Sequence, residues 1–272
     1  MKGNLYIVAT PIGNLEDITL RAIKILKEVD LIAAEDTRHT LKLLNHLEIK
    51  KPLVSYYKQI EHTKTESLIE KLLEGKNIAL VSDAGTPAIS DPGEVIVKKA
   101  IANNIKVIPI PGACAFVNAL IASGISTNEF YFVGFLPVNK KEKKEKLEKL
   151  INYQNTLIFY EAPHKLLNTL KQMMEIFGNR KVVLAREITK IHEEFLRGTL
   201  EDILNKNMEP KGEYVVIIEG NDKEENEINF LNLTVEEHYK IYEEQGLSKK
   251  EIIKKIAHDR KVPKNEIYKK VL

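Results

Sequence analysis

Short apolar runs alternate with amphipathic segments along the first 110 residues of the chain. The runs are rich in β-branched residues, which is typical of strands buried on both faces. They predict strands at 4–9, 31–34, 52–56, 77–82 and 106–110. One intervening helix is expected to begin at the capping box Thr63–Glu66 and to end at Gly75, with an apolar face of Leu68, Ile69, Leu72 and Leu73. Strands that alternate with helices predict a parallel sheet with right-handed crossovers.

A second α/β unit is predicted to follow a helix over about 112–123. Its strands are expected at 130–135, 156–160, 181–186, 193–199 and 213–219. The helix between the last two, at 200–206, is short, so these strands need not be parallel and a mixed sheet is expected. The pattern therefore divides the chain into an α/β domain over 1–123 with a parallel sheet and an α/β domain over 124–222 with a mixed sheet.

The end of the chain has a helical pattern over 230–272, after a linker expected at 221–229. Two capping boxes, Thr234–Glu237 and Ser248–Glu251, mark the starts of helices in this region. A helix–turn–helix pattern with basic residues is compatible with nucleic-acid binding. It is also compatible with a small bundle that packs on the body of the protein or on a dimer partner.

Charge is distributed unevenly around a formal net charge of +2. Residues 221–245 carry eight acidic side chains and two lysines, whereas residues 246–272 carry nine basic and three acidic side chains. The basic segment could contact phosphates, or it could be a solvated helix face or pair with the acidic segment. Residues 140–149 hold six lysines and three glutamates, which indicates the polar face of an exposed helix, with RNA contact as the alternative.

Composition excludes several classes of protein. With 272 residues and 43% hydrophobic side chains, the chain can bury a sizeable core, so large-scale disorder is not expected. No apolar run approaches the ~20 residues of a membrane span, and the first residues lack the pattern of a signal peptide. The single cysteine, Cys114, excludes an internal disulfide and a cysteine-based zinc site, and no other metal cluster is evident. A cytoplasmic protein without membrane contact is therefore expected.

Three loops are candidates for a binding site, because each leaves the carboxyl end of a predicted strand, where open α/β sheets bind ligands. The loop at 9–14 makes a tight turn at Pro11 and Gly13, but it lacks the glycine pattern of a dinucleotide site and the lysine of a P-loop. Alone, it would usually be only a turn.

The other two loops lie at 82–93 and 109–115. The first holds two Gly, two Pro and two Asp in twelve residues, which predicts a fixed backbone with carboxylates at set positions. Asp83 could accept hydrogen bonds from a hydroxyl or an ammonium group, and Asp91 is expected to cap a helix that begins at Pro92. Small residues at 109–115 would let a ligand approach backbone N–H groups at a helix N-terminus, or would serve close helix–sheet packing.

Charged side chains also lie at the ends of two predicted strands of the second α/β unit, in segments 159–164 and 185–190. A further charged segment, 192–198, comes next in the sequence. Arginine, glutamate and lysine at strand ends could bind phosphate and accept a proton. An ordinary surface cluster of ion pairs would have the same composition.

Six segments together closely resemble the RsmI-type family of ribose 2′-O-methyltransferases of bacterial small-subunit ribosomal RNA. The most specific is Asp83–Gly93, and the others are Ala9–Asn14, Glu35–Arg38, Gly134–Pro137, Phe159–Glu161 and Ala185–Lys190. The resemblance extends over about the whole chain and is strongest over residues 4–220. It implies the tetrapyrrole-methylase fold, with two α/β domains, S-adenosylmethionine in the cleft between them, and usually a homodimer. The implied substrate is a cytidine ribose in the decoding region, methylated on its 2′ oxygen within the small subunit.

The resemblance, together with the strand-end positions, gives a predicted site. The cofactor pocket is expected to be formed by Pro11, Ile12, Asp83, Gly85, Thr86, Pro87, Cys114, Ala115, Tyr160, Ala185 and Glu213. Arg38, Arg186 and Lys190 are expected to hold RNA phosphate, and Glu161 or Glu187 to accept the proton of the ribose hydroxyl. Methyl transfer requires the ribose oxygen in line with the sulfonium–carbon bond, and no metal is needed.

Two other functions compete with this interpretation. One is a methylase of the same fold that acts on a tetrapyrrole or another small molecule, which would need a deep apolar cleft rather than a wide basic one. The other is a non-catalytic RNA-binding factor that has kept the fold, which would not bind S-adenosylmethionine.

Overall fold

The computed structural model of this chain describes residues 1–206, 208–221, 233–244, 246–260 and 262–271. Residues 1–221 form one compact unit and residues 222–272 a second, and the two are described separately. The linker predicted at 221–229 lies, except for Asn221, outside the described residues.

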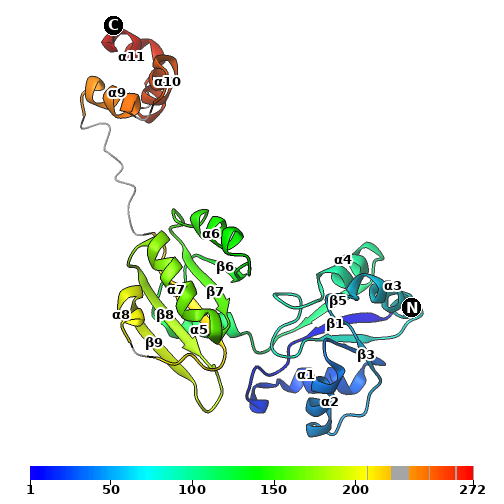
Figure 1. The fold of residues 1–272 in the computed structure, drawn as a ribbon. Coiled ribbons are helices and arrows are strands. Elements are labelled where there is room, and N and C mark those ends of the chain that lie inside the picture. Colours follow the sequence, from blue (N-terminus) through cyan, green and yellow to red (C-terminus); the bar gives the residue numbers. More distant parts are fainter. Residues whose placement is uncertain (207, 222–232, 245, 261, 272) are drawn as a thin grey trace. The chain divides into compact units, whose positions relative to one another are not determined.

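The first sheet contains five parallel strands in the order β3-β2-β4-β1-β5. Figure 1 labels β1, β3 and β5 of this sheet. The bounds are Asn4–Val8 for β1, Leu31–Ala34 for β2, Leu53–Ser55 for β3, Ile78–Val81 for β4 and Lys106–Ile110 for β5. Each observed strand lies within the range predicted from its apolar run. The parallel sheet predicted for the first unit is confirmed.

Helices cover both faces of this sheet, which explains the unbroken apolar character of its strands. On one face, α3 (Glu61–Leu73) and α4 (Glu94–Ala102) pack through Leu68, Leu72 and Ile96. On the other face, α1 (Leu20–Glu28) and α2 (Thr37–His46) pack through Leu26 and Leu44, and the short 3-10 helix η1 (Leu15–Asp17) precedes α1.

The predicted start of α3 is wrong. The helix begins at Glu61, after Ile60, so Thr63–Glu66 lies inside its first two turns and caps nothing. Thr65 is buried there, with its hydroxyl 2.9 Å from the hydroxyl of Tyr56. The segment predicted to start the helix therefore lies within it, and its middle residue Thr65 contacts Tyr56. Gly75, with φ +97°, follows the last turn as expected.

The second sheet contains five strands in the order β6-β7-β10-β8-β9. The bounds are Phe130–Phe135 for β6, Thr156–Glu161 for β7, Lys181–Arg186 for β8, Glu194–Thr199 for β9 and Tyr214–Ile218 for β10. β6 and β7 are parallel, and the other neighbours are antiparallel. The predicted mixed sheet is confirmed.

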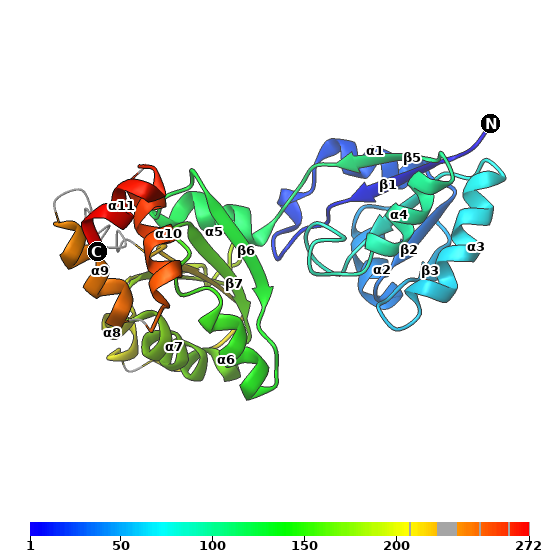
Figure 2. The ribbon, with the colours of Figure 1, turned by 90° about the horizontal axis from the view of Figure 1, so that it is seen from above.

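Both faces of the second sheet are covered (Figure 2). On one face lie α6 (Lys140–Glu148), α7 (Pro163–Phe177) and α8 (Leu200–Leu204), and on the other lies α5 (Ala115–Ser123). Ala119 and Leu120 of α5 pack against the strands of this second sheet. The helix predicted at the end of the first domain thus contributes to the core around the second sheet, and a domain boundary at residue 123 stays a prediction.

The C-terminal unit contains α9 (Val235–Glu244), α10 (Lys249–Asp259) and α11 (Lys264–Val271). They share a small core that includes Ile252 and Ile256. Both predicted capping boxes are confirmed, with Glu237 accepting from the backbone N–H of Thr234 at 2.8 Å and Glu251 from that of Ser248 at 3.0 Å. None of the helices among the described residues has the length and apolar character needed to span a bilayer.

Candidate active site

The three predicted binding loops meet at the carboxyl edge of the first sheet. They leave β1, β4 and β5, which are neighbouring parallel strands, so the carboxyl ends of these three strands lie side by side. Thr10 and Gly85 exchange backbone hydrogen bonds of 2.9 and 3.0 Å, and the Thr86 hydroxyl donates to the carbonyl of Ala113 at 3.0 Å. The loops are therefore joined to one another as a fixed rim.

Gly112 allows the loop at 109–115 to approach the loop at 9–14 closely. A Cβ on this residue would lie 2.8 Å from the Cβ of Ala9, at the end of β1. Any larger residue would push the two loops apart. Close packing and ligand approach were alternative roles for the small residues of this loop, and the Gly112–Ala9 approach is a case of close packing.

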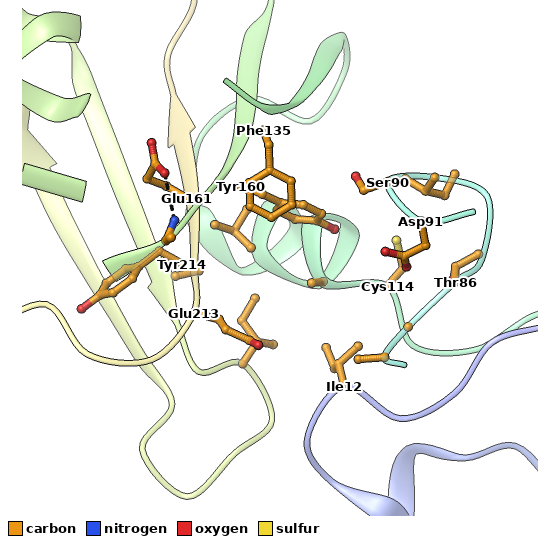
Figure 3. Close-up of a pocket in the computed structure, with 18 of the residues that line it drawn as sticks. Ile12, Thr86, Ser90, Asp91, Cys114, Phe135, Tyr160, Glu161, Glu213 and Tyr214 are labelled. Carbon is orange, nitrogen blue, oxygen red and sulfur yellow. Dashed lines mark hydrogen bonds between the residues drawn. The ribbon is translucent and has the colours of Figure 1, made fainter. Parts of the chain in front are cut away.

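A pocket of about 330 Å³ opens against this rim (Figure 3). The second sheet supplies its other walls, through the ends of β7, β8 and β10 and the start of α7. The lining residues are Ile12, Ala84, Gly85, Thr86, Ile89, Ser90, Asp91, Cys114, Ala115, Phe135, Tyr160, Glu161, Ala162, Pro163, Ala185, Ile188, Glu213, Tyr214 and Val215.

The lining brings together most of the residues predicted to bind a cofactor. It includes Ile12, Gly85, Thr86, Cys114, Ala115, Tyr160, Ala185 and Glu213. It does not include Pro11, Asp83 or Pro87. The Asp83 carboxylate instead accepts a hydrogen bond of 2.9 Å from the backbone N–H of Asp36, so it ties the loop after β4 to the loop after β2.

Asp91 does not cap a helix, contrary to the prediction. α4 begins at Glu94 after Gly93, and Asp91 lies in the pocket lining. Burial raises the pKa of the Asp91 carboxyl, a hydrogen bond from Ser82 opposes that shift, and the negative charge of Asp83 adds to it. The pKa of Glu35 is also raised, by burial and then by the charges of Asp91 and Asp83.

The pocket lining is largely apolar and includes three carboxylates. Its ionisable carboxylates are Asp91, Glu161 and Glu213, and among the residues that the structure describes no basic side chain lines it. Nor does any group of three or more His, Cys, Asp or Glu side chains, within those residues, form a metal site. The site can therefore hold a ligand with cationic groups and an apolar body.

Tyr160 connects the end of β7 to the start of α5. Its hydroxyl accepts a hydrogen bond of 3.3 Å from the backbone N–H of Phe116, in the first turn of α5. Burial raises the pKa of the Tyr160 phenol, so the ring is neutral at physiological pH. Its ring also packs on Phe132, with centroids 5.1 Å apart, and on Phe135, with centroids 5.4 Å apart.

Glu161 is held by donors on both oxygens. One oxygen accepts from the backbone N–H of Ala162 at 2.9 Å, and the other accepts from the Thr169 hydroxyl at 2.5 Å. The Lys143 ammonium donates to the same hydroxyl at 2.5 Å. Lys143 and Thr169 come from α6 and α7, and the sequence analysis assigned neither to the site.

Of the five residues predicted to be catalytic, only Glu161 lines the pocket. The Lys190 ammonium lies between Glu187 and Glu213, at 3.0 and 3.1 Å from their carboxylates. Arg186 donates to the carbonyl of Lys211 at 2.8 Å. The exposed Arg38 pairs with Asp36 at 2.7 Å. Arg38, Arg186, Glu187 and Lys190 themselves lie outside the pocket lining, and of the partners named here only Glu213, which binds Lys190, lines the pocket.

The residues that sequence reasoning missed fall into two groups. The first group lies inside segments that the sequence had singled out, so these segments contained a signal for them: Ala84, Ile89 and Ser90 in Asp83–Gly93, Phe135 in Gly134–Pro137, Ala162 and Pro163 in 159–164, and Ile188 in Ala185–Lys190. Tyr214 and Val215 begin β10 and lie in no motif. Their only signal was that they stand next to Glu213 at a strand end.

Comparison with known proteins places this fold and site among the methylases. The pattern of the family described as Tetrapyrrole (Corrin/Porphyrin) Methylases matches residues 4–204. A uroporphyrin-III C-methyl transferase from Thermus thermophilus, solved in complex with S-adenyl homocysteine, shares the fold with a TM-score of 0.57 and 16% identity. It covers 80% of this chain and 97% of its own.

Two curated relatives narrow the class. The Ribosomal RNA small subunit methyltransferase I of Halalkalibacterium halodurans is 54% identical, over 98% of this chain and 94% of its own length. The protein of the same name from Bacillus subtilis is 52% identical, over 98% and 93%. The chain belongs to the family of ribosomal RNA small subunit methyltransferase I, within the tetrapyrrole methylases.

Proposed function

We propose that the protein transfers a methyl group from S-adenosylmethionine to ribosomal RNA of the small ribosomal subunit. The observation that carries the proposal is the pocket at the carboxyl edge of the first sheet, where three hydrogen-bonded loops face a wall from the second sheet. The names of the relatives supply the substrate class.

The residues present fit this cofactor. S-adenosylmethionine carries a flat apolar adenine and two cationic groups, the sulfonium and the ammonium. The pocket offers apolar walls from Tyr160, Tyr214 and Val215, together with carboxylates and no basic lining side chain among the described residues. The N-terminus of α5 also borders the pocket through Cys114 and Ala115, and although the N–H of Phe116 is bound to Tyr160, the positive end of the helix dipole suits a carboxylate. When bound, the cofactor supplies an electrophilic methyl group.

The proton of the attacking ribose hydroxyl needs an acceptor in the pocket. Glu187 was a candidate, but it lies outside the lining and pairs with Lys190. Glu161 lines the pocket, but both of its oxygens already accept hydrogen bonds. We therefore assign the role to Asp91, whose raised pKa makes it a better base than an ordinary carboxylate.

The remaining residues position the reactants. Tyr160, from the end of β7, and Ile12, from the loop after β1, both line the pocket (Figure 3). Lys190 holds Glu213 at the rim. Holding the ribose oxygen in line with the reacting carbon is worth several orders of magnitude in rate, so a rigid pocket contributes as much as the base.

The finer specificity is part of the same proposal. We assign the 2′ oxygen of a cytidine ribose in the decoding region as the acceptor, with the reaction taking place in the cytoplasm, where small subunits are assembled.

We also propose a homodimer. Leu20, Ile121 and Ile191 are exposed apolar side chains, and they lie on the segments that border a second hollow, lined by Thr19, Ala122 and Thr189 among others. A second copy would bury them. Light scattering of wild-type protein and of Ile121→Lys would test this. A dimer that the substitution weakens is expected, and a monomeric wild type would refute it.

The test of the main proposal uses tritiated S-adenosylmethionine and small subunits from a strain that lacks this protein. The wild type is expected to label one nucleotide, which is then located by mass spectrometry of RNA fragments. Asp91→Asn is expected to lose most of the transfer rate while calorimetry shows that it still binds S-adenosylhomocysteine. Failure of the wild type to bind the cofactor would favour a non-catalytic RNA-binding factor. Transfer to a tetrapyrrole but not to subunits would favour a small-molecule methylase.

A further inference from the structure

Phe135 is an exposed aromatic residue at the mouth of the pocket. It is 62% exposed, although it belongs to a strand of the second sheet and lines the pocket. Figure 3 shows its ring beside that of Tyr160, on the wall opposite Asp91 and Cys114. Single exposed apolar side chains are common, but an exposed ring that also lines a binding pocket is placed to contact a ligand.

A β-bulge determines that Phe135 faces this pocket. In the pairing of β6 with β7, Phe132 lies opposite Ile158, but Gly134 lies opposite Phe159 and Phe135 opposite Tyr160. The extra residue, Val133, reverses the alternation of side chains beyond it. Without the bulge, Phe135 would point to the other face of the sheet. Gly134 permits this irregularity with φ +72°, a conformation that few other residues adopt.

The Phe135 ring belongs to a cluster of aromatic rings that pack against one another. Phe116 stacks on Phe132 with centroids 4.4 Å apart, and Tyr160 contacts both Phe132 and Phe135. The hydrogen bond from the backbone of Phe116 to the Tyr160 hydroxyl fixes this arrangement. Phe135 is thus the exposed end of a supported aromatic cluster, with one ring face available for a planar ligand.

Positive charge lies close by in the chain. The loop after Phe135 leads within five residues into α6, whose first turn presents the exposed Lys140 and Lys141. An exposed aromatic ring next to exposed lysines is the usual composition of a surface that binds single-stranded nucleic acid. The pocket interior, by contrast, has no basic side chain among the described residues.

We propose that Phe135 is the platform on which the nucleobase of the target RNA nucleotide stacks. The nucleotide leaves its own stack, its base rests on the exposed ring, and its ribose then points into the pocket toward Asp91. Lysines at the start of α6 contact the neighbouring phosphates. This inference rests on the proposed function, because it takes RNA as the substrate. Stacking on the adenine of the cofactor is the competing role for the same ring.

The experiment compares Phe135→Leu with Phe130→Leu. Phe130 is a matched control, since it lies on the same strand, is 43% exposed and does not line the pocket. Each variant is assayed for methyl transfer to unmodified small subunits, and for S-adenosylhomocysteine affinity by calorimetry. Because stacking on an aromatic side chain is worth roughly 1–3 kcal/mol per base, Phe135→Leu is expected to raise KM for subunits by roughly five- to a hundred-fold. Its affinity for S-adenosylhomocysteine should change less than about two-fold.

Phe135→Trp keeps a flat ring and is expected to restore KM, which a purely structural role would not predict. Unchanged KM in Phe135→Leu would overturn the proposal, as would an equal effect in Phe130→Leu. A parallel loss of S-adenosylhomocysteine affinity would show that the ring faces the cofactor. If the wild type methylates no RNA, the proposed function fails first, and the affinity measurement still reports separately on the cofactor role of the ring.

Discussion

The ammonium group of Lys143 lies 3.9 Å from the carboxylate of Glu161, and the two side chains are only 9% and 6% exposed. Thr169 connects them, accepting from the lysine and donating to the glutamate. Burial lowers the pKa of Lys143, the charge of Glu161 opposes that shift, and the charge of Lys165 reinforces it. A lysine from a highly polar helix thus reaches the carboxylate that forms part of the pocket wall.

Removing this lysine should destabilise the protein strongly. Lys143→Met leaves the buried Glu161 without its counter-charge, and the expected loss in the free energy of unfolding is about 3–5 kcal/mol. Lys144→Met is the control, because Lys144 pairs with Glu148 on the exposed side of the same helix, where such pairs contribute about 0.3–0.5 kcal/mol. Urea denaturation measures both. Equal stability of the two variants would show that the buried pair is not maintained in solution.

Local pattern identified the strands well, because a strand buried on both faces must be apolar throughout. The run at 31–34 and the strand Leu31–Ala34 coincide, and the run at 181–186 coincides with Lys181–Arg186. The mixed character of the second sheet was expected from the short connection between β9 and β10, but the antiparallel pairs are those that each of these strands makes with β8. The order of the strands within each sheet was not predicted, because contacts between residues far apart in sequence decide which strands are neighbours.

The residues that were misassigned are those whose roles depend on distant partners. Asp91 resembled a helix cap, but its environment is set by Asp83 and Ser82 at the end of β4 and by Glu35 at the end of β2. Thr63–Glu66 resembled a capping box, but α3 begins earlier, at Glu61, and Thr65 is held inside the helix by its contact with Tyr56. Lys143 did carry a weak signal, because it falls on the same helix face as the buried Leu147 and Leu150. Six lysines in ten residues obscured that spacing.

Asp91→Asn should stabilise the protein at neutral pH. The pKa of Asp91 in the folded state is raised above its ordinary value of 3.8, so folding favours the protonated form. The stability that the protonated carboxyl allows is fully present below pH 3.8 and is lost as pH rises through the folded-state pKa. At pH 7 the carboxylate is charged and buried, which lowers the stability of the folded state. The melting temperature of Asp91→Asn should therefore exceed that of wild type at pH 7, and the difference should shrink toward pH 4.

Asp202→Asn is the matched control with the opposite sign. The backbone N–H and the hydroxyl of Thr199 lower the pKa of the Asp202 carboxyl, at the start of α8. Its stabilisation is present above its unfolded-state pKa and is lost as pH falls through the folded-state pKa. Asp202→Asn should therefore lower the melting temperature at pH 7. A lower melting temperature for Asp91→Asn at pH 7 would contradict the burial of its charge.

Gly134 should tolerate asparagine but not valine. Its φ of +72° lies in the left-handed region, which asparagine can adopt and β-branched residues strongly disfavour. Gly134→Val is expected to remove the bulge and turn Phe135 away, with a rise in KM for subunits like that of Phe135→Leu. Gly134→Asn should keep KM within a few-fold of wild type, as steady-state methyl transfer will show.

The control for backbone strain is Gly124→Val. Gly124 has φ +81° at the end of α5, with no other group within 4 Å of an added Cβ, so the substitution is strained but remote from the pocket. It should lower stability without changing KM. If Gly124→Val raises KM as much as Gly134→Val does, the kinetic effect reflects general destabilisation rather than the direction of Phe135.

The exposed lysines of α6 should contact RNA phosphates, because this helix begins five residues after Phe135. The triple variant Lys140→Ala, Lys141→Ala, Lys144→Ala is expected to bind small subunits more weakly and with a flatter dependence on salt. Each lost phosphate contact reduces the slope of log K against log salt concentration by roughly 0.7–0.9, so a decrease of roughly two is expected. Filter binding between 50 and 300 mM KCl gives the slope.

The C-terminal helices offer a control of equal charge. Lys249, Lys250 and Lys254 are exposed on α10, and replacing all three with alanine removes the same number of charges. Because α9, α10 and α11 bury their apolar residues in a core of their own, these substitutions should leave the unit folded. An unchanged salt slope for this variant would assign the phosphate contacts to the mouth of the pocket. A flatter slope here, with none for the α6 variant, would instead identify α10 as the RNA-binding surface.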